Sequence, residues 1–365
     1  MLVIDTEVYS DYFLLSAKQL SSGNVRHFEQ YPGHPLDTKT VAAMMRSQTT
    51  ISFNGLTFDL PIIIAALSGW DCKSIKRLAD KIIKSGFPAW RICRDENILV
   101  PDSWDHIDLI EVAPGRSSLK IYGGRMNAPK MQDLPIEPDA SIAPDMRKTL
   151  RDYCVNDLDT TELLYQRLEK AIDLRADMSK QYGMDLRSKS DAQVAETIIK
   201  SELTAITGKD YRAPQLPDNY VFRYLDPKVI SFKTDALNAV FQRILAERFT
   251  LGPNGSVLMP AWLRENKITI GEAQYQMGIG GLHSCETGQF VRCEADEVLA
   301  DWDVASYYPN IILQQRLAPK SLGAPFLRVY QSIVQRRLEA KKRAQEIAKE
   351  IAALMPEVSL AQVEK

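Results

Sequence analysis

Short apolar runs that lead into carboxylates recur in this chain, and they limit its fold more than any other feature. Residues 2–4 run directly into Asp5-Thr6-Glu7, and the apolar run 50–54 is followed by Asp59. The first run is expected to be a strand that ends in its two acids, which point together because residues two apart on a strand share a face. Behind the second run, a helix is predicted from Pro61.

A further acid lies on a long helical pattern. Residues 146–172 carry apolar side chains at helical spacing, which predicts one long helix. Tyr153 and Asp157 are four positions apart and are therefore neighbours on one face of that helix. Residues 188–203 are the clearest helical part of the charged stretch that follows. Strands that carry acids, with helices behind them, indicate an α/β fold class.

Carboxylates from different elements that converge on one place can hold hard divalent cations. In phosphodiester hydrolysis, two such ions ~4 Å apart clamp the attacking and leaving oxygens. We therefore expect a site for two Mg²⁺ or Mn²⁺ ions where these acids meet. Taken singly, each acid is equally well explained as a turn former, a helix cap or a solvated helix residue.

Three segments, in this order, resemble the DxE, Nx₃FD and Yx₃D exonuclease motifs of family B DNA polymerases: Asp5-Thr6-Glu7, residues 54–59 and residues 153–157. The resemblance implies a ribonuclease H-like 3′→5′ proofreading exonuclease domain over residues 1–205. It implies that the two metal ions bind Asp5, Glu7, Asp59 and Asp157, and that Tyr153 orients the attacking water. It also implies that Asn54 and Phe58 hold the single-stranded 3′ end, Phe58 by stacking on a base.

A shorter segment, Ser118-Leu119-Lys120-Ile121-Tyr122, resembles the SLx₂h element that contacts single-stranded DNA in the same domain. The resemblance implies that Ser118 and Leu119 bind DNA. An ordinary strand or helix start is the alternative.

Residues 301–312 resemble motif A of the same polymerases, DxxSLYPSII. The resemblance implies that the Asp303 carboxylate and the Val304 carbonyl bind the magnesium ions of a polymerase palm. It further implies that Ser306 and Tyr307 contact the triphosphate and that Tyr308 stacks under the sugar. Tyr307 stands where the family usually has Leu, and Asn310 where it has Ser, so the fine substrate contacts differ. Without the resemblance, this stretch predicts a strand over residues 298–304 followed by a proline turn.

Two other segments resemble polymerase elements. Residues 275–281 are similar to the YxGG/A element that touches template, with Tyr275, Gly280 and Gly281 as its DNA contacts; an ordinary glycine-rich hairpin is the alternative. Residues 326–354 predict a long basic helix, closed by Pro356, that is similar to the first fingers helix. Arg337 and Lys341 lie on one face of this helix and would bind the triphosphate. A solvated basic helix is the alternative.

The expected order is an exonuclease domain (1–205), a linker and partial palm with motif A (206–325, of which 214–260 is connecting chain), and one fingers helix (326–365). This is α/β followed by an incomplete α+β palm. No segment resembles motif B or motif C. We therefore expect a natural split or a truncation near the fingers tip, and a second polypeptide that completes the polymerase. Asp5 lies near the start, as in compact phage enzymes, whereas cellular relatives carry a large preceding domain.

Composition narrows the class of protein. Lys and Arg number 45 against 47 Asp and Glu, a net charge of −2, which disfavours a protein that merely coats DNA. No apolar run approaches ~18 residues, so no membrane partner is expected, and the acids Asp5 and Glu7 exclude a signal peptide. The five cysteines include no CxxC pair, which favours reduced thiols and a cytoplasmic location. The resemblance to phage-type polymerases implies that this is the cytoplasm of a bacterium or of a phage-infected bacterial cell.

Three functions compete. The leading hypothesis is an active exonuclease that forms part of a DNA polymerase and binds single-stranded 3′ ends. A non-catalytic DNA-binding or assembly subunit is disfavoured by the intact acids at every motif position. A stand-alone nuclease of the DEDD type is disfavoured by the motif A segment, which such an enzyme does not need.

Overall fold

A computed structural model describes residues 1–115, 117–212, 216–217, 219–252, 255–278 and 280–354. The chain divides into two compact units, Met1–Gly208 and Lys209–Lys365. Within the described ranges, no helix has the length and apolar character needed to cross a lipid bilayer.

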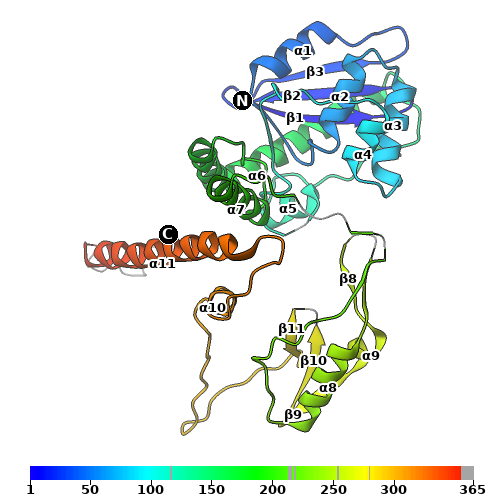
Figure 1. Cartoon of the computed structure of the whole chain (residues 1–365). Coiled ribbons are helices and arrows are strands. Elements are labelled where there is room, and N and C mark those ends of the chain that lie inside the picture. The colour runs from blue at the N-terminus through cyan, green and yellow to red at the C-terminus, as the bar shows by residue number, and fades with distance from the viewer. Residues whose placement is uncertain (116, 213–215, 218, 253–254, 279, 355–365) are drawn as a thin grey trace. The chain divides into compact units, whose positions relative to one another are not determined.

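A five-stranded mixed sheet forms the centre of the first unit, in the order β3-β2-β1-β4-β5 (Figure 1). Its strands are β1 (Leu2–Val8), β2 (Phe13–Gln19), β3 (Val25–Gln30), β4 (Thr50–Ser52) and β5 (His106–Asp108). The first three are antiparallel, whereas β4 pairs in parallel with β1 and β5 with β4. β1 is therefore the central strand, with a neighbour of each kind.

One apolar core joins this sheet to the helices that follow β3 and β4. Leu2, Ile4, Phe13 and Leu15 lie in it with Leu60, Ile63 and Ile75. The helices are α1 (Thr38–Ser47), α2 (Asp59–Leu67), α3 (Cys72–Lys84) and α4 (Ala89–Asp95). The sheet residues of this core alternate along each strand, as expected for one face of a sheet.

The long helix α6 (Met146–Tyr182) packs against β1 and β2 through Leu150 and Cys154, which lie in a core with Tyr12 and Leu14. Further along, α6 contacts α5 (Leu119–Arg125) and places Leu164 in the core with Ile51 and Ile107. α7 (Asp191–Thr207) starts at a capping box formed by Ser190 and Gln193.

The second unit contains two small sheets and four helices among its described residues. The sheets are β6 (Val221–Phe222), β7 (Phe249–Leu251) and β8 (Val257–Leu258), and β9 (Lys267–Ile270), β10 (Ala273–Gly278) and β11 (Gly281–Ser284). The helices are α8 (Asp235–Ala246), α9 (Ala261–Glu265), α10 (Tyr307–Gln314) and α11 (Gly323–Leu354).

The α/β class of the first unit is confirmed, and so are the predicted long helices of both units. α6 covers the predicted residues 146–172 and continues to Tyr182, and α7 and α11 lie where helices were predicted. α2 begins at Asp59 rather than at Pro61. Pro356, predicted to close the last helix, is outside the described residues.

Two predictions for the second unit are wrong. Residues 298–304 form no strand; Val298 and Trp302 are each 90% exposed, and no described segment pairs with this backbone. A strand needs hydrogen-bonded neighbours, and local sequence cannot supply them. The stretch 214–260 is more than connecting chain, because it holds α8 and the sheet that contains β7. Phe249 of β7 is buried, and the centre of its ring lies 4.8 Å from that of Tyr224.

Candidate metal centre

Asp5 and Glu7 lie on β1, the central strand, with Val8 as its last residue. Both are half-buried, and a carboxylate oxygen of each lies within 4.8 Å of the other and of the Cys154 sulfur. The thiol of Cys154 donates to Asp5 Oδ2 over 3.3 Å. The strand thus presents two acids on one face, as predicted from their spacing, and this face meets α6.

Thr6, between those acids, contacts a different element. Its hydroxyl donates to Asp59 Oδ1 over 2.6 Å. Asp59 is 3% exposed and is the first residue of α2, so the helix N-terminus stabilises its negative charge. The third predicted ligand is therefore held beside β1 by a side chain of β1 itself.

Tyr153 and Asp157 lie on one face of α6, as predicted, and Tyr153 hydrogen-bonds to the Asp157 carboxylate. Asp157 is close enough to raise the pKa of Glu7 by repulsion between the two negative charges. The described residues whose ligand atoms lie within 4.8 Å of one another are Asp5, Glu7 and Cys154, so Asp59 and Asp157 form the outer part of the group.

The carboxyl groups of Asp5, Glu7 and Asp59 have raised pKa values. Burial, with repulsion from Asp157 and Asp59, raises the pKa of Glu7 to about 8. Burial also raises the pKa of Asp59 to about 7 against the opposing bond from Thr6. The pKa of Asp5 is raised well above its usual value by burial and by repulsion from Asp59, Glu7 and Asp157. Carboxylates that are buried and crowded in this way hold their protons more tightly than exposed ones do.

The donor set fits hard divalent cations. Asp5 and Glu7 offer carboxylate oxygens within 4.8 Å of each other and of the Cys154 sulfur, and carboxylate oxygen is the ligand type that Mg²⁺ or Mn²⁺ prefers. The sulfur of Cys154 is the one soft atom among them, and burial and the charge of Asp5 raise the pKa of its thiol well above the usual value. It therefore acts as a hydrogen-bond donor to Asp5 rather than as a thiolate.

Asp108 is a residue that the sequence reasoning missed. It ends β5, is 1% exposed, and accepts hydrogen bonds from the backbone N–H groups of Asn54 (2.8 Å), Leu56 (2.9 Å) and Ile110 (3.1 Å). These bonds fix the turn that leads into Asp59. The local signal was weak, since Ile107 is the only apolar residue directly before Asp108, and the partners of Asp108 are distant in sequence.

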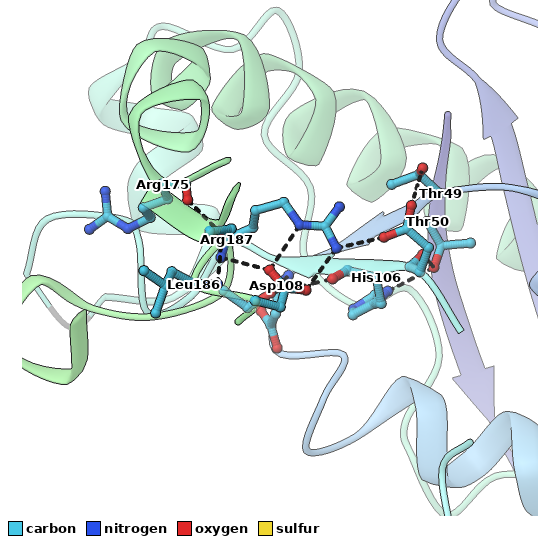
Figure 2. Close-up of polar contacts among 11 residues, drawn as sticks. Thr49, Thr50, His106, Asp108, Arg175, Leu186 and Arg187 are labelled. Atoms are coloured by element: carbon cyan, nitrogen blue, oxygen red, sulfur yellow. Dashed lines mark hydrogen bonds and ion pairs between the residues drawn. The ribbon is translucent and has the colours of Figure 1, made fainter. Parts of the chain in front are cut away.

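The loop between α6 and α7 supports Asp108 from the other side (Figure 2). Ser188 Oγ accepts from the Asp108 N–H over 2.9 Å. Arg187 pairs with Asp105 at 2.6 Å and with Asp185 at 2.7 Å. Arg175 of α6 donates to the Lys189 carbonyl over 2.8 Å. The loop, β5 and the turn before Asp59 thus form one hydrogen-bonded group.

The predicted contacts of a DNA 3′ end lie around this turn. Asn54 has a φ of 70°, lines a pocket of about 600 Å³ together with Thr57 and Asp108, and is half-buried. Phe58 is the half-buried N-cap of α2. Ser118, which is exposed, caps α5 by accepting from the Ile121 N–H, so the SLx₂h segment is a helix start, with Leu119 half-buried.

Most residues of the motif A segment are exposed, whereas Ser306, Pro309, Ile311 and Ile312 are half-buried. Asp303 and Val304 lie in the irregular chain before α10 and meet no second carboxylate cluster in the described part of the protein. Ser306, the N-cap of α10, has a φ of 51°, and Arg337 of α11 donates to its hydroxyl over 3.2 Å. The rings of Tyr307 and Tyr308 lie 5.5 Å apart. Lys341 is exposed on α11.

The glycine-rich segment forms a hairpin. Tyr275 lies in β10 opposite Ser284, and Gly278 pairs with Gly281, the first residue of β11. Gly281 has a φ of 145°, which favours glycine. Gly280 lies in the turn, and Ile279 is outside the described residues.

No family model matches this sequence, and no curated protein or solved structure shows a significant similarity to it. The candidate site therefore has to be interpreted from its own residues.

Proposed function

We propose that the first unit is a two-metal 3′→5′ exodeoxyribonuclease that removes nucleotides from single-stranded DNA. The observation that carries this proposal is the pair Asp5 and Glu7 on one face of β1, in a group where burial and repulsion from Asp59 of α2 and Asp157 of α6 raise the pKa of both acids. Such a group, next to a tyrosine, suits the cleavage of a phosphodiester by bound divalent cations.

Under this proposal, Asp5, Glu7, Asp59 and Asp157 would hold two divalent cations, which would supply activation of water and stabilisation of the leaving oxygen when bound. Thr6 orients Asp59 through its 2.6 Å bond. Tyr153 hydrogen-bonds to Asp157 and orients the attacking water. Asn54 and Phe58, in the segment just before Asp59, would position the 3′-terminal nucleotide.

The fold supports the same proposal. The mixed sheet, with its acids on the central strand and on two flanking helices, is compatible with a ribonuclease H-like domain. Acids on regular elements rather than loops give a rigid geometry, and two-metal chemistry depends on such geometry.

The test is removal of the β1 acids. A 5′-labelled single-stranded oligonucleotide is incubated with the full chain and Mg²⁺ or Mn²⁺, and shortening is followed on a gel. Asp5→Ala with Glu7→Ala should abolish shortening. Asp152→Ala is the matched control, because Asp152 is an exposed acid of α6 that pairs with Lys148. Equal rates for the double variant and the parent contradict the proposal.

A second candidate function, part of the nucleotide site of a DNA polymerase, is favoured by the bond from Arg337 to Ser306. This bond joins the motif A segment to the basic helix α11, which places a cation beside the proposed triphosphate contacts. Under this proposal, synthesis requires a second polypeptide that carries motifs B and C. Primer extension should occur only in the mixture, and Asp303→Ala should stop extension there while sparing the exonuclease. Extension by this chain alone contradicts it.

A further inference from the structure

Four cations form a stripe along α3: Lys73, Arg77, Lys81 and Lys84, all exposed. Their spacings of four, four and three positions put them on one face of the helix. The stripe is roughly 16 Å long at 1.5 Å per helical residue. We call these four residues the α3 stripe.

The α3 stripe lines a shallow hollow of about 520 Å³ and keeps much of its charge unpaired. Lys84 pairs with Asp80 at 3.0 Å, and Lys81 pairs with Glu96. Lys73 and Arg77 make no ion pair within the described residues. Residues 71–96 contain seven Lys or Arg against four Asp or Glu, a net charge of +3 in a chain whose total is −2.

Two exposed aromatic rings follow the stripe. Phe87 is 52% and Trp90 65% exposed. The Arg91 guanidinium lies 4.3 Å from the centre of the Phe87 ring, and that of Arg94 lies 5.4 Å from the Trp90 ring. Large exposed rings of this kind are costly in water, and unpaired bases stack on them readily.

The stripe lies near the proposed cleavage site. Ser10, which follows the end of β1, lines the same hollow as the stripe, and α3 contacts β1. Figure 1 shows α3 and α4 on the same unit as the strand that carries Asp5 and Glu7. A strand of DNA whose 3′ end is held at Asp5 and Glu7 would therefore meet this hollow beside Ser10, which is three positions after Glu7 on the chain.

We propose that the α3 stripe and the rings of Phe87 and Trp90 bind the single-stranded part of the substrate upstream of its 3′ end. The stripe would contact successive phosphates, and the rings would stack on bases. This inference rests on the proposed exonuclease and adds a second contact region to it. Single-stranded DNA is the occupant because the surface combines cations at regular spacing with exposed rings, as in other proteins that bind single strands.

Binding is measured first, in a background of Asp5→Ala with Glu7→Ala so that the probe stays intact. The probe is a fluorescent thymidine oligonucleotide of about 15 nucleotides, the scale of known single-strand sites, and its anisotropy gives the affinity. Lys73→Glu with Arg77→Glu should weaken binding at least tenfold. The salt slope should fall by about 1.4, at ~0.7 for each lost phosphate contact.

The matched control is Lys170→Glu with Lys180→Glu, which makes the same change of charge at exposed positions of α6. An equal loss in the control would show a general effect of charge and would overturn the proposal. Unchanged binding by the stripe variant would also overturn it. Polyglutamate or anionic lipid vesicles that compete as well as unlabelled oligonucleotide would assign the surface to another partner. Circular dichroism checks that each variant is folded.

The rings are tested by Phe87→Ala with Trp90→Ala. Affinity should fall about tenfold, as for lost base stacking, with the salt slope unchanged because no charge is removed. A parallel loss of salt slope would contradict the assigned roles.

Cleavage separates this inference from the function on which it rests. With Asp5 and Glu7 intact, the stripe variant should remove nucleotides from very short oligonucleotides at the parent rate. On long oligonucleotides its cleavage rate should be at least tenfold lower than that of the parent. An equal loss on both lengths would overturn the upstream assignment. A parent chain that cleaves nothing but binds DNA through the stripe would refute the exonuclease and keep the surface.

Discussion

The Thr6 hydroxyl donates to Asp59 Oδ1 over 2.6 Å, although the two residues are 53 positions apart. Both groups are buried, so the bond fixes the orientation of a carboxylate that water cannot reach freely. It joins the strand of the first two acids to the helix of the third. The contact therefore orients the Asp59 carboxylate beside the strand that carries Asp5 and Glu7.

Thr6→Val should lower the cleavage rate and the affinity for the divalent cation roughly 10- to 100-fold, because partners that orient metal ligands have effects of this size. Valine keeps the shape of threonine, so the fold should persist. Thr6→Ser retains a donor and should recover most of the activity. Single-turnover cleavage at increasing Mn²⁺ concentration measures both quantities. A Thr6→Val enzyme with parental metal dependence would show that this bond has no positioning role.

Stability of the metal-free chain should fall as pH rises. The folded pKa of Glu7 is about 8 against an ordinary 4.5, and that of Asp59 is about 7 against 3.8. Both pKa values are raised, so the contribution of the two protonated carboxyls to the free energy of unfolding is full below about pH 4. It is lost as pH rises through 7 to 8, at up to ~1.4 kcal/mol per pH unit for each proton. Urea unfolding in EDTA from pH 5 to 9 checks the slope.

Glu7→Gln should flatten that slope, because the amide does not titrate. Divalent cations should also flatten it, since they replace the protons as positive charge. A stability that rises from pH 5 to 9 in EDTA would contradict the raised pKa values.

Tyr153→Phe should reduce cleavage less than Asp157→Asn does. The phenylalanine leaves every carboxylate in place and removes only the hydroxyl that bonds to Asp157 and orients water. The asparagine removes a charged ligand. We expect metal affinity to be close to normal in Tyr153→Phe and clearly lowered in Asp157→Asn, as measured by Mn²⁺ titration. The reverse order would assign Tyr153 a different role.

Gly55→Ala should destabilise the first unit by about 1–3 kcal/mol through overpacking. A Cβ at this position would lie 1.8 Å from Ser52 Oγ and 3.1 Å from His106 Nε2, in the turn that Asp108 holds. Gly124→Ala is the control, because its Cβ would meet only ordinary contact with Met131 at 3.5 Å. Thermal unfolding compares the two variants. Equal stabilities would show that the turn can relax.

Much of the first unit was predictable because its signals are local. The apolar run of residues 2–4 and the helical period of residues 146–172 are local patterns, and a strand and a helix form over them as expected, although β1 continues to Val8 and α6 to Tyr182. The placement of Asp59 at a helix start followed from the same kind of pattern. Whether these acids catalyse the proposed reaction stays a prediction.

What local patterns missed depends on distant partners. Asp108 becomes important only because the Asn54 and Leu56 N–H groups reach it across 54 and 52 positions. Residues 298–304 have the composition of a strand but meet no pairing edge in the described part of the chain. α8 was missed because the prolines and turn residues around it outweighed its own apolar spacing.

The central place of β1 has a consequence for the order of assembly. β1 precedes the other four strands of its sheet along the chain and can pair early with β2, but its parallel neighbour β4 and the acids of α6 come much later. Closing such long loops is slow, so the last part of the site forms late in folding. A growing chain therefore carries Asp5 and Glu7 well before Asp157 can join them, and the candidate site is assembled only after α6 has been made.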